Sequence, residues 1–397
     1  MVSSRQLFLN HLAQTSLAPM LLEISSARGV FLFDKYEKKY FDLISGVNVS
    51  ALGHGNQRVI NAIKKQADKH LHLMVYGEFL QEPQIEYAAL LTSYLPSHLS
   101  SVYFVNSGSE AVDGALKLAK KYTGRAEILS FRNAYHGSSI GAMSIMGSEN
   151  YTHGYYPLMP GVAHLNFNDF SELEKITTKT ACVVAEVIQA EAGMILPRGD
   201  FLRALRKRCD MTGTLLILDE IQTGLGRMGT LFGFEYYGIE PDILLLAKSF
   251  GGGLPLGAFI ASRELMEVIS YNPALGHITT FGGNPLCCAA GKACFEAILD
   301  EDIWLTVPEK EVLFREKLTH PAIREIRGKG LMLAVDLGHK DLMHKVVELG
   351  VAEGFVTDWF LFCETAIRIS PPLIIKEEEI SEVCEQINIA IDKASAQ

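Results

Sequence analysis

The chain has 397 residues, of which 48% are hydrophobic and 21% are charged, and its formal net charge at pH 7 is −10. The length and the apolar content indicate a large folded core and exclude a disordered or fibrous chain. The negative charge, together with the lack of a long basic run, argues against binding to nucleic acid or to an anionic membrane surface.

The N-terminal residues and the cysteines point to an ordinary cytoplasmic protein. The segment MVSSRQLFLNHLAQ has no long apolar stretch, so we expect no signal peptide. No window approaches the about 18 apolar residues that a membrane-spanning helix requires. The seven cysteines include the adjacent Cys287 and Cys288 but no CxxC pair. This usage favours reduced thiols over disulfides or a bound metal, and we predict no metal site.

Short apolar runs alternate with helical patterns in the middle of the chain. Strands are expected over 100–105, 126–131, 182–188, 214–220 and 242–247, and helices over 109–124 and 201–213, which end at Gly124 and Gly213. Such alternation is typical of an α/β fold, in which helices cover both faces of a largely parallel sheet.

The pattern changes toward the C-terminus. Residues 328–338 and 366–375 predict strands, and residues 377–394 predict a final amphipathic helix. We therefore expect three divisions of the chain. They are an N-terminal segment at 1–45 that joins the small domain, a large domain at 46–289 and a small α+β domain at 290–397.

The stretch VNSGSEAVDGA, residues 105–115, is a candidate anion site. A strand ends there at a Ser-Gly-Ser turn, and a helix begins with Glu110 in its first turn. Unpaired amides and the positive end of the helix dipole favour an anion at such a place. Ser107, Gly108 and Ser109 could therefore hold a phosphate. Taken alone, the stretch is better explained by an ordinary serine N-cap.

Two ionisable residues end two of the expected apolar strands. Asp219 follows TLLIL, and Lys248 follows DILLLA. In a parallel sheet both would lie at the same edge, where α/β proteins bind ligands. A lysine at the end of a buried strand loses hydration that its charged form needs, which lowers its pKa and makes the amine available as a nucleophile.

A nucleophilic lysine, a carboxylate and an anion site together predict a site for pyridoxal phosphate. The lysine amine would form a Schiff base with the cofactor's aldehyde. The carboxylate would keep the ring nitrogen protonated, so that the ring acts as an electron sink. That pairing is worth about 4 kcal/mol at ~4 Å and an effective dielectric of about 20, before desolvation costs.

A GxGxxG pattern at Gly224, Gly226 and Gly229 suggests an alternative, a nicotinamide-dependent oxidoreductase. The dinucleotide fingerprint places its glycines directly between a strand and a helix. Here two acidic residues precede the glycines, and the following residues, TLFGFEYYGIEPD, show no helical period. The context therefore argues against a dinucleotide site.

Several motifs occur in the order that one enzyme family has them. They are YFDLISGVNVSALGHGN, NSGSEAVDGALKLAKKYTGR, YHGSSIGAMS, EVIQAEAG, LDEIQTGLGRMG, PDILLLAKSFGGGLPLGA, TTFGGNPL and IRISPPLII. From about residue 19 to residue 385, the chain resembles the class III aminotransferases of the fold-type I pyridoxal-phosphate enzymes. The resemblance implies a homodimer with shared active sites, as well as the fold expected above.

The resemblance also implies residue roles. Lys248 matches the Schiff-base lysine and proton shuttle, and Asp219 matches the partner of the pyridine nitrogen. Arg368 matches the arginine that binds a substrate carboxylate, and Glu191 the acid that pairs with that arginine otherwise. The remaining implied cofactor-binding residues are Ser107, Gly108 and Ser109 at the phosphate, Tyr135 and Ile221 on the ring faces, Gln222 near the phenolic oxygen, Thr280 reaching the phosphate from the partner subunit, and His136 and Glu186 nearby. For His136, a purely structural role is the alternative that we favour.

One departure from the family pattern bears on which substrate the enzyme can bind. Ornithine, acetylornithine and 4-aminobutyrate members typically carry an arginine directly after the motif that contains Tyr135 and His136, and that arginine binds a distal carboxylate. Ser138 stands there in this chain. A serine cannot make the charged bidentate contact.

The resemblance thus implies ping-pong transfer of an amino group from an ω-amine or diamino acid to an α-keto acid such as 2-oxoglutarate or pyruvate. Several alternatives stay open. They are an acetylornithine or ornithine aminotransferase, a related epimerase, aminomutase or decarboxylase, and a non-catalytic binding protein on the same scaffold.

Overall fold

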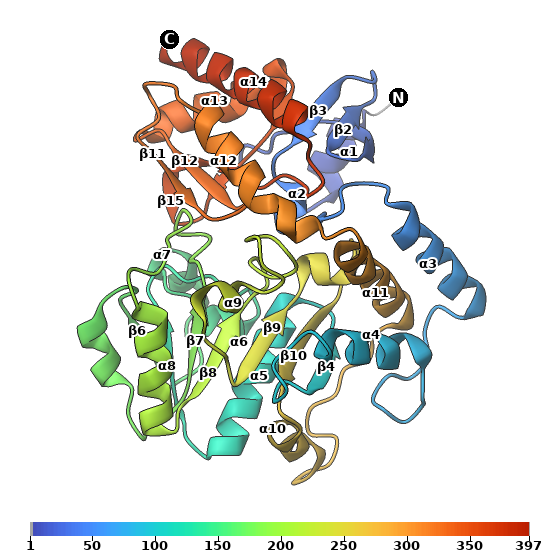
Figure 1. Cartoon of the computed structure of the whole chain (residues 1–397), viewed down its shortest axis with the longest axis vertical. Coiled ribbons are helices and arrows are strands. Elements are labelled where there is room, and N and C mark those ends of the chain that lie inside the picture. Colours follow the sequence, from blue (N-terminus) through green and yellow to red (C-terminus); the bar gives the residue numbers. More distant parts are fainter. Residues whose placement is uncertain (1–2, 397) are drawn as a thin grey trace.

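The structure is a computed structural model, and it describes residues 3–396 (Figure 1). Its centre is a seven-stranded sheet of strand order β4-β10-β9-β8-β7-β5-β6. The strands are β4 (Ser101–Val105), β5 (Glu127–Phe131), β6 (Val162–Leu165), β7 (Thr180–Glu186), β8 (Leu215–Asp219), β9 (Ile243–Leu246) and β10 (Gly257–Ala261). Only β10 runs antiparallel to its neighbours, so the largely parallel α/β sheet expected from the sequence is confirmed.

The apolar strands are explained by helices on both faces of this sheet. Successive side chains of a strand point to opposite faces. In β8, Leu216 and Leu218 share a core cluster with α8 (Phe201–Thr212), whereas Leu215 and Ile217 share another with α5 (Gly108–Thr123). Both faces are therefore buried, and a continuous apolar run is the pattern that such a strand requires.

Helix signals in the sequence agree with the observed ends of these helices. Ser107 caps α5, and its side chain accepts a hydrogen bond from the Glu110 backbone at 3.2 Å. Gly124 and Gly213 follow α5 and α8 in the left-handed conformation, with φ of 67° and 60°. A glycine adopts that conformation without the steric penalty of a side chain, so it ends a helix readily.

The remaining strands form two smaller sheets in the upper part of Figure 1, where both chain ends also lie. One has the order β1-β2-β3-β13 and the other β11-β12-β15-β14. Their bounds are β1 (Ile24–Arg28), β2 (Phe31–Asp34), β3 (Lys39–Asp42), β11 (Glu325–Gly328), β12 (Leu333–Asp336), β13 (Phe355–Val356), β14 (Trp359–Phe360) and β15 (Cys363–Ile369). The helices α12 (Val307–Lys317), α13 (Lys340–Glu353) and α14 (Glu377–Ser395) accompany them.

Three expectations about local structure are wrong. Residues 328–338 form no single strand, because the chain turns between β11 and β12, with Gly330 at φ 62°. The apolar run therefore covers a turn and one arm of a hairpin. Residues 366–375 form a strand only as far as Ile369, where β15 ends, because Pro371 and Pro372 have no N–H to donate to a neighbouring strand. The short helix α9 (Gly233–Tyr237) follows the GxGxxG pattern, and its five residues are too few to show a helical period.

Eight further α-helices complete the fold of the described residues. They are α1 (Ser4–His11), α2 (Ser45–Asn48), α3 (Gln57–Lys69), α4 (Glu82–Thr92), α6 (Ile140–Ser144), α7 (Glu149–Thr152), α10 (Arg263–Glu267) and α11 (Pro285–Asp300). Helix α11 packs against both α3 and α4 on the right of Figure 1. Within residues 3–396, no helix combines the length and the apolar character needed to cross a bilayer.

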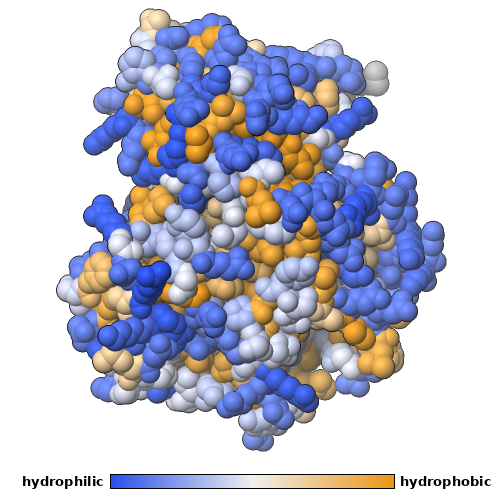
Figure 2. All heavy atoms as spheres, viewed as in Figure 1, coloured by the Kyte–Doolittle hydropathy of each residue, from blue (hydrophilic) through white to orange (hydrophobic). Residues whose placement is uncertain are grey.

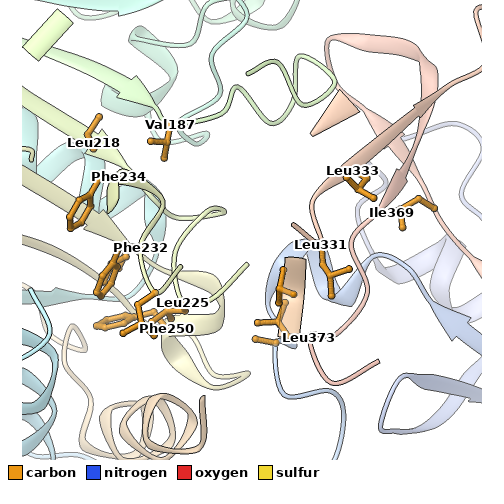
Figure 3. Packing of buried hydrophobic residues seen from close by; sticks show 14 of the residues in the cluster. Val187, Leu218, Leu225, Phe232, Phe234, Phe250, Leu331, Leu333, Ile369 and Leu373 are labelled. Carbon is orange, nitrogen blue, oxygen red and sulfur yellow. The ribbon is translucent and has the colours of Figure 1, made fainter. Parts of the chain in front are cut away.

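The upper and lower parts share one hydrophobic core. Figure 2 shows a waist between them, with apolar side chains exposed along it. Beneath it, a single cluster joins Phe232 and Phe250 of the lower part to Leu331 and Leu373 of the upper part (Figure 3). The buried Arg227 also bridges the two parts, because its Nη1 donates to the carbonyls of Leu331, at 3.1 Å, and Pro371. This packing fixes the position of β15 relative to the large sheet.

Candidate active site

The carboxyl ends of β8 and β9 meet at one edge of the large sheet. These strands pair in parallel, with Asp219 opposite Leu245, and Lys248 follows shortly after β9. Both residues line a cavity of about 430 Å³. The other predicted residues on its wall are Ser107, Gly108, Ser109, Tyr135, His136, Glu186, Ile221 and Gln222. The fold thus gathers most of the predicted site residues at the place where parallel α/β sheets bind ligands.

Lys248 begins the short 3-10 turn Lys248–Gly251 with a positive φ of 56°. A lysine rarely adopts this conformation, and residues held so are frequent at active sites. Burial lowers the pKa of the Lys248 amine to about 8, and Arg368 acts in the same direction, whereas the carboxylates of Glu191 and Asp219 oppose it. At neutral pH, a much larger fraction of this amine is therefore uncharged than for a lysine in water.

Asp219 is held by two donors. Its Oδ1 accepts a hydrogen bond from the Ile221 backbone N–H at 3.0 Å, and its Oδ2 lies 2.7 Å from Nδ1 of the buried His136. Because a carboxylate only accepts, the proton of this contact belongs to Nδ1. His136 therefore orients Asp219, and this contact is a role that its position in the sequence did not reveal. Its other nitrogen, Nε2, is buried without a hydrogen-bond partner among residues 3–396.

Glu186 ends β7 directly beside Asp219 in the sheet register. Its carboxyl group accepts hydrogen bonds from the backbones of Ala190 at 3.1 Å and Tyr135 at 3.3 Å. Burial raises the pKa of Glu186 well above its ordinary value, and the nearby Asp219 raises it further. Two neighbouring carboxylates disfavour double ionisation, and burial adds to this effect at Glu186, so both act against the charged form of Glu186.

The N-terminus of α5 closes another side of the cavity. The first N–H groups of a helix have no intrahelical acceptor, and they attract an anion. A Cβ on Gly108 would lie 2.8 Å from Ile221 Cδ1, and one on Gly137 would lie 2.1 Å from Ser109 Oγ. The glycines thus let the helix start, the strand-end loop and the loop of Tyr135 approach closely.

A hydrogen-bonded chain leads from the cavity to Arg368. Gln222 Nε2 donates to Glu191 Oε1 at 3.3 Å, and both oxygens of Glu191 lie 3.2 Å from Arg368 Nη2. Burial alone would raise the pKa of Glu191, but the cations of Arg368 and Lys248 hold it below its ordinary value. Asn48 Nδ2 donates to Gln222 Oε1 at 2.9 Å. Asn48 lies in the motif YFDLISGVNVSALGHGN, but no role was predicted for it, because it reaches the site only through the fold.

Thr280 and Ser138, like Glu191 and Arg368, are not among the residues that line the cavity. Thr280 is exposed and is absent from the described cavity wall of its own chain. Ser138 is exposed next to the cavity-lining Gly137, and its hydroxyl lies 3.3 Å from the hydroxyl of Tyr135. The structure therefore leaves both outside the cluster around Lys248 and Asp219.

Comparison with known proteins identifies the family. The family model described as "Aminotransferase class-III" matches residues 12–391. The acetylornithine aminotransferase of Methanocaldococcus jannaschii is 38% identical over 375 residues, or 91% of each chain. That of Bacillus cereus is 36% identical over 380 residues, covering 94% of this chain and 95% of its own. The chain belongs to the class III aminotransferases, and it is a transaminase.

Solved structures agree with this assignment. The ornithine aminotransferase of Toxoplasma gondii ME49 superposes with a TM-score of 0.92 at 28% identity, covering all of this chain and 96% of its own. An (S)-enantioselective omega-transaminase from Thermomicrobium roseum gives a TM-score of 0.92 at 28% identity over 98% of each chain. The fold-type I architecture and the aminotransferase class predicted from the sequence are thereby confirmed, and the cofactor of the family is pyridoxal phosphate.

The cavity fits this cofactor chemically. It offers an amine for the aldehyde at Lys248, a carboxylate for the ring nitrogen at Asp219, and a helix N-terminus for the phosphate at Ser107–Ser109. Its volume of about 430 Å³ lies within the range of small-molecule sites.

Proposed function

We propose that this aminotransferase moves an amino group from an ω-amine or diamino acid to an α-keto acid such as 2-oxoglutarate or pyruvate, with Lys248 and Asp219 as its catalytic residues. One observation carries the proposal. A lysine amine whose pKa is lowered to about 8 shares a cavity with an oriented carboxylate and a helix N-terminus. Pyridoxal phosphate, when bound, supplies an electron sink for the carbon that loses its proton.

The residues around the cavity have different proposed roles in cofactor binding and proton transfer. Lys248 holds the cofactor covalently and, when released, moves a proton at the reacting carbon as a general base and acid. Asp219, oriented by Ile221 and His136, keeps the ring nitrogen protonated. Ser107, Gly108 and Ser109 bind the phosphate through the start of α5. The remaining residues proposed to bind the cofactor directly are Tyr135 and Ile221 on the ring faces and Gln222 at the phenolic oxygen. Glu186 and His136 are proposed to belong to the cofactor site from behind Asp219.

Arg368 and Glu191 are proposed to recognise the α-amino or α-keto acid partner. The observed ion pair satisfies the charge of Arg368 when no substrate carboxylate is present. When a carboxylate enters, it replaces Glu191 at the guanidinium. A partner without that carboxylate is accepted with the ion pair in place. Such an exchange lets one site bind glutamate or 2-oxoglutarate and also an amine.

The amino donor is the point on which two candidates differ. The exposed Ser138 supplies no positive charge at the place where the family resemblance implies an arginine in acetylornithine members, and this favours a donor without a distal carboxylate. The second candidate is acetylornithine transamination, which is supported by the names of the curated relatives. The two candidates differ in whether a carboxylate of the donor must lie near Ser138.

A donor panel combined with one substitution separates these candidates. With 2-oxoglutarate as acceptor, we expect diamines, which carry no carboxylate, to exceed acetylornithine as donors. Ser138→Arg should raise kcat/KM for acetylornithine about tenfold, because a charge-assisted contact with a carboxylate is worth about 1.4 kcal/mol, on the order of a factor of ten. Ser138→Gln, which is long but uncharged, serves as the matched control.

Two results of this panel would contradict the proposal. If acetylornithine is already the best donor of the unchanged protein, the second candidate holds instead. If a chiral amino acid changes its configuration without any keto acid and no amino group is transferred, the chain acts as an epimerase on the same cofactor. Transfer of nitrogen to 2-oxoglutarate, followed as glutamate formation, distinguishes these reactions.

We also propose that the protein is a homodimer in which Thr280 of the partner subunit completes each cofactor site. Thr280 is exposed and lies among exposed apolar side chains. Phe281 packs against His72 with ring centroids 4.7 Å apart, and Asn284 Nδ2 donates to the Leu71 carbonyl at 3.1 Å, so this segment adjoins residues 71–72. The exposed apolar residues of the segments 71–80 and 278–281 are Leu71, Leu73, Met74, Phe79, Leu80, Ile278 and Phe281. Patches of this kind mark interfaces.

Mixing two defective variants tests the shared site. Lys248→Ala alone should be inactive, and Thr280→Ala alone should bind the cofactor about tenfold more weakly, since one charged hydrogen bond is lost. After dissociation and reassembly together, a mixed dimer contains one site with both native residues. We expect activity at limiting cofactor to rise above that of either variant. No recovery in a mixture that sedimentation shows to contain mixed dimers would contradict the proposed sharing.

A cytoplasmic location is proposed from the cysteine chemistry. All seven cysteines are free thiols in the structure. Burial raises the pKa values of Cys209, Cys294 and Cys384 to about 12, which keeps these thiols protonated and unreactive. Buried reduced thiols are typical of a reducing compartment.

A further inference from the structure

Arg368 has two carboxylate partners, and the sequence pointed to only one of them. Besides Glu191 at Nη2, the Oδ1 atom of Asp358 accepts a hydrogen bond from Arg368 Nε at 2.7 Å. The ring of Phe360 lies against the guanidinium, with its centroid 4.6 Å from Cζ. The remaining nitrogen, Nη1, is buried and has no acceptor among the described residues 3–396.

The two carboxylates hold different parts of the guanidinium. Asp358 contacts Nε, the nitrogen attached to the side-chain stem, whereas Glu191 contacts the outer nitrogen Nη2. If Glu191 withdraws, the outer edge formed by Nη1 and Nη2 becomes available to a carboxylate. Asp358 can keep its contact throughout, because the edge that it uses is a different one.

Asp358 itself has a fixed place in the fold. The backbone N–H of Arg368 donates to the Asp358 carbonyl at 2.9 Å, and Thr357 Oγ1 donates to the Arg368 carbonyl. The next residue, Trp359, pairs with Ile367 between β14 and β15. The segment that carries Asp358 is thus hydrogen-bonded to the strand that carries Arg368, and the two side chains keep their relative position.

We infer that Asp358 is a positioning residue that, by holding Nε, sets the plane of the Arg368 guanidinium so that Nη1 and Nη2 receive the carboxylate of the α-amino or α-keto acid partner. This inference rests on the carboxylate-binding role proposed above for Arg368. A planar guanidinium binds a carboxylate bidentately only in a narrow range of orientations, so its orientation determines affinity. The Asp358 side chain is 30% exposed, and water screens its charge. Its hydrogen bond therefore matters more than its charge.

Three substitutions separate the hydrogen bond from the charge. Asp358→Asn keeps an oxygen that accepts from Nε and removes the charge. Asp358→Ala removes both. Asp358→Ser is a second short variant that keeps a polar side chain at this partly exposed position but does not reach Nε. Cofactor absorbance and thermal unfolding show which variants are folded and loaded.

The measurement is the equilibrium binding of glutarate to the cofactor-loaded enzyme by calorimetry. Glutarate carries the carboxylates of the glutamate skeleton but has no group that reacts. Asp358→Ala and Asp358→Ser should bind it about tenfold more weakly, since one charged hydrogen bond is lost. Asp358→Asn should bind it as tightly as the unchanged enzyme or more tightly, because a competing anion has been removed.

Kinetics of the half-reaction with glutamate give an independent readout. Asp358→Ala and Asp358→Ser should raise the KM for glutamate by about the same factor by which they weaken the binding of glutarate. The limiting rate of the half-reaction should change less than about twofold. Unchanged glutarate binding in both short variants would overturn the inference. Equal weakening in Asp358→Asn and Asp358→Ala would also overturn it, because charge rather than position would then be responsible.

Arg368→Ala distinguishes the failure of this inference from the failure of the proposed function. If this variant binds glutarate as the unchanged enzyme does, the proposed role of Arg368 is wrong, and the role of Asp358 falls with it. If Arg368→Ala loses binding whereas the short Asp358 variants do not, only the positioning role is wrong. If glutarate binding is lost in Arg368→Ala, weakened in Asp358→Ala and Asp358→Ser, and retained in Asp358→Asn, the result supports both the role of Arg368 and the role of Asp358.

Discussion

Replacement of Lys248 by alanine is expected to lower turnover by at least about a thousandfold, since it removes both the nucleophile and the proton-transfer group. The loss follows from position as well as chemistry. Burial lowers the pKa of this amine to about 8, so it is available as a base near neutral pH. The change should be measured as steady-state transamination of the best donor with 2-oxoglutarate.

A matched variant separates the loss of the amine from damage to the site. Lys248→Arg keeps a cation and a long side chain, but a guanidinium stays protonated in proteins and forms no covalent bond with an aldehyde. It should be as inactive as Lys248→Ala while unfolding at a similar temperature. Turnover at the unchanged rate in either variant would contradict the proposed role of Lys248.

Replacement of Asp219 by asparagine is expected to lower turnover by about a hundredfold to a thousandfold. A carboxylate about 4 Å from a protonated ring nitrogen contributes about 4 kcal/mol at an effective dielectric of about 20, and desolvation reduces that contribution. The asparagine has nearly the same shape and still accepts from Ile221. The ring nitrogen would lose its proton, and with it the power to withdraw electrons.

The sheet provides a control for this prediction. Glu186 lies beside Asp219 in register, and burial and the charge of Asp219 raise its pKa, which favours its neutral form. Glu186→Gln should therefore change kcat less than about threefold, because the amide resembles the form that this environment favours. If Glu186→Gln and Asp219→Asn are equally defective, the assignment of the charged partner to Asp219 is wrong.

The central part of the fold and the site could be predicted from local patterns. Apolar runs predicted the buried strands, and Ser107, Gly124 and Gly213 marked helix ends, because each of these signals acts within a few residues. Asp219 and Lys248 were recognisable since polar residues directly after such runs must lie at a sheet edge. Parallel pairing of β8 and β9 then brings them together.

The parts that the sequence did not reveal depend on contacts between distant segments. The hairpin of β11 and β12 appears as one apolar run, because the turn residues around Gly330 are covered by other parts of the chain. Asn48 reaches Gln222 across 174 positions. His136 reaches Asp219 across 83 positions. Asp358 stands out only through the hydrogen bond that its side chain accepts from Arg368 Nε. A single carboxylate or amide carries no local signal of such a partner.

The most direct test of the account is to locate the covalent attachment of the cofactor. The protein loaded with pyridoxal phosphate is reduced with borohydride, digested and mapped by mass spectrometry. We expect the cofactor's mass on Lys248, and we expect Lys248→Ala to lose the visible absorbance of the bound cofactor. Attachment to another lysine, or no attachment in protein that has bound the cofactor, would contradict the central claim that Lys248 is the catalytic amine.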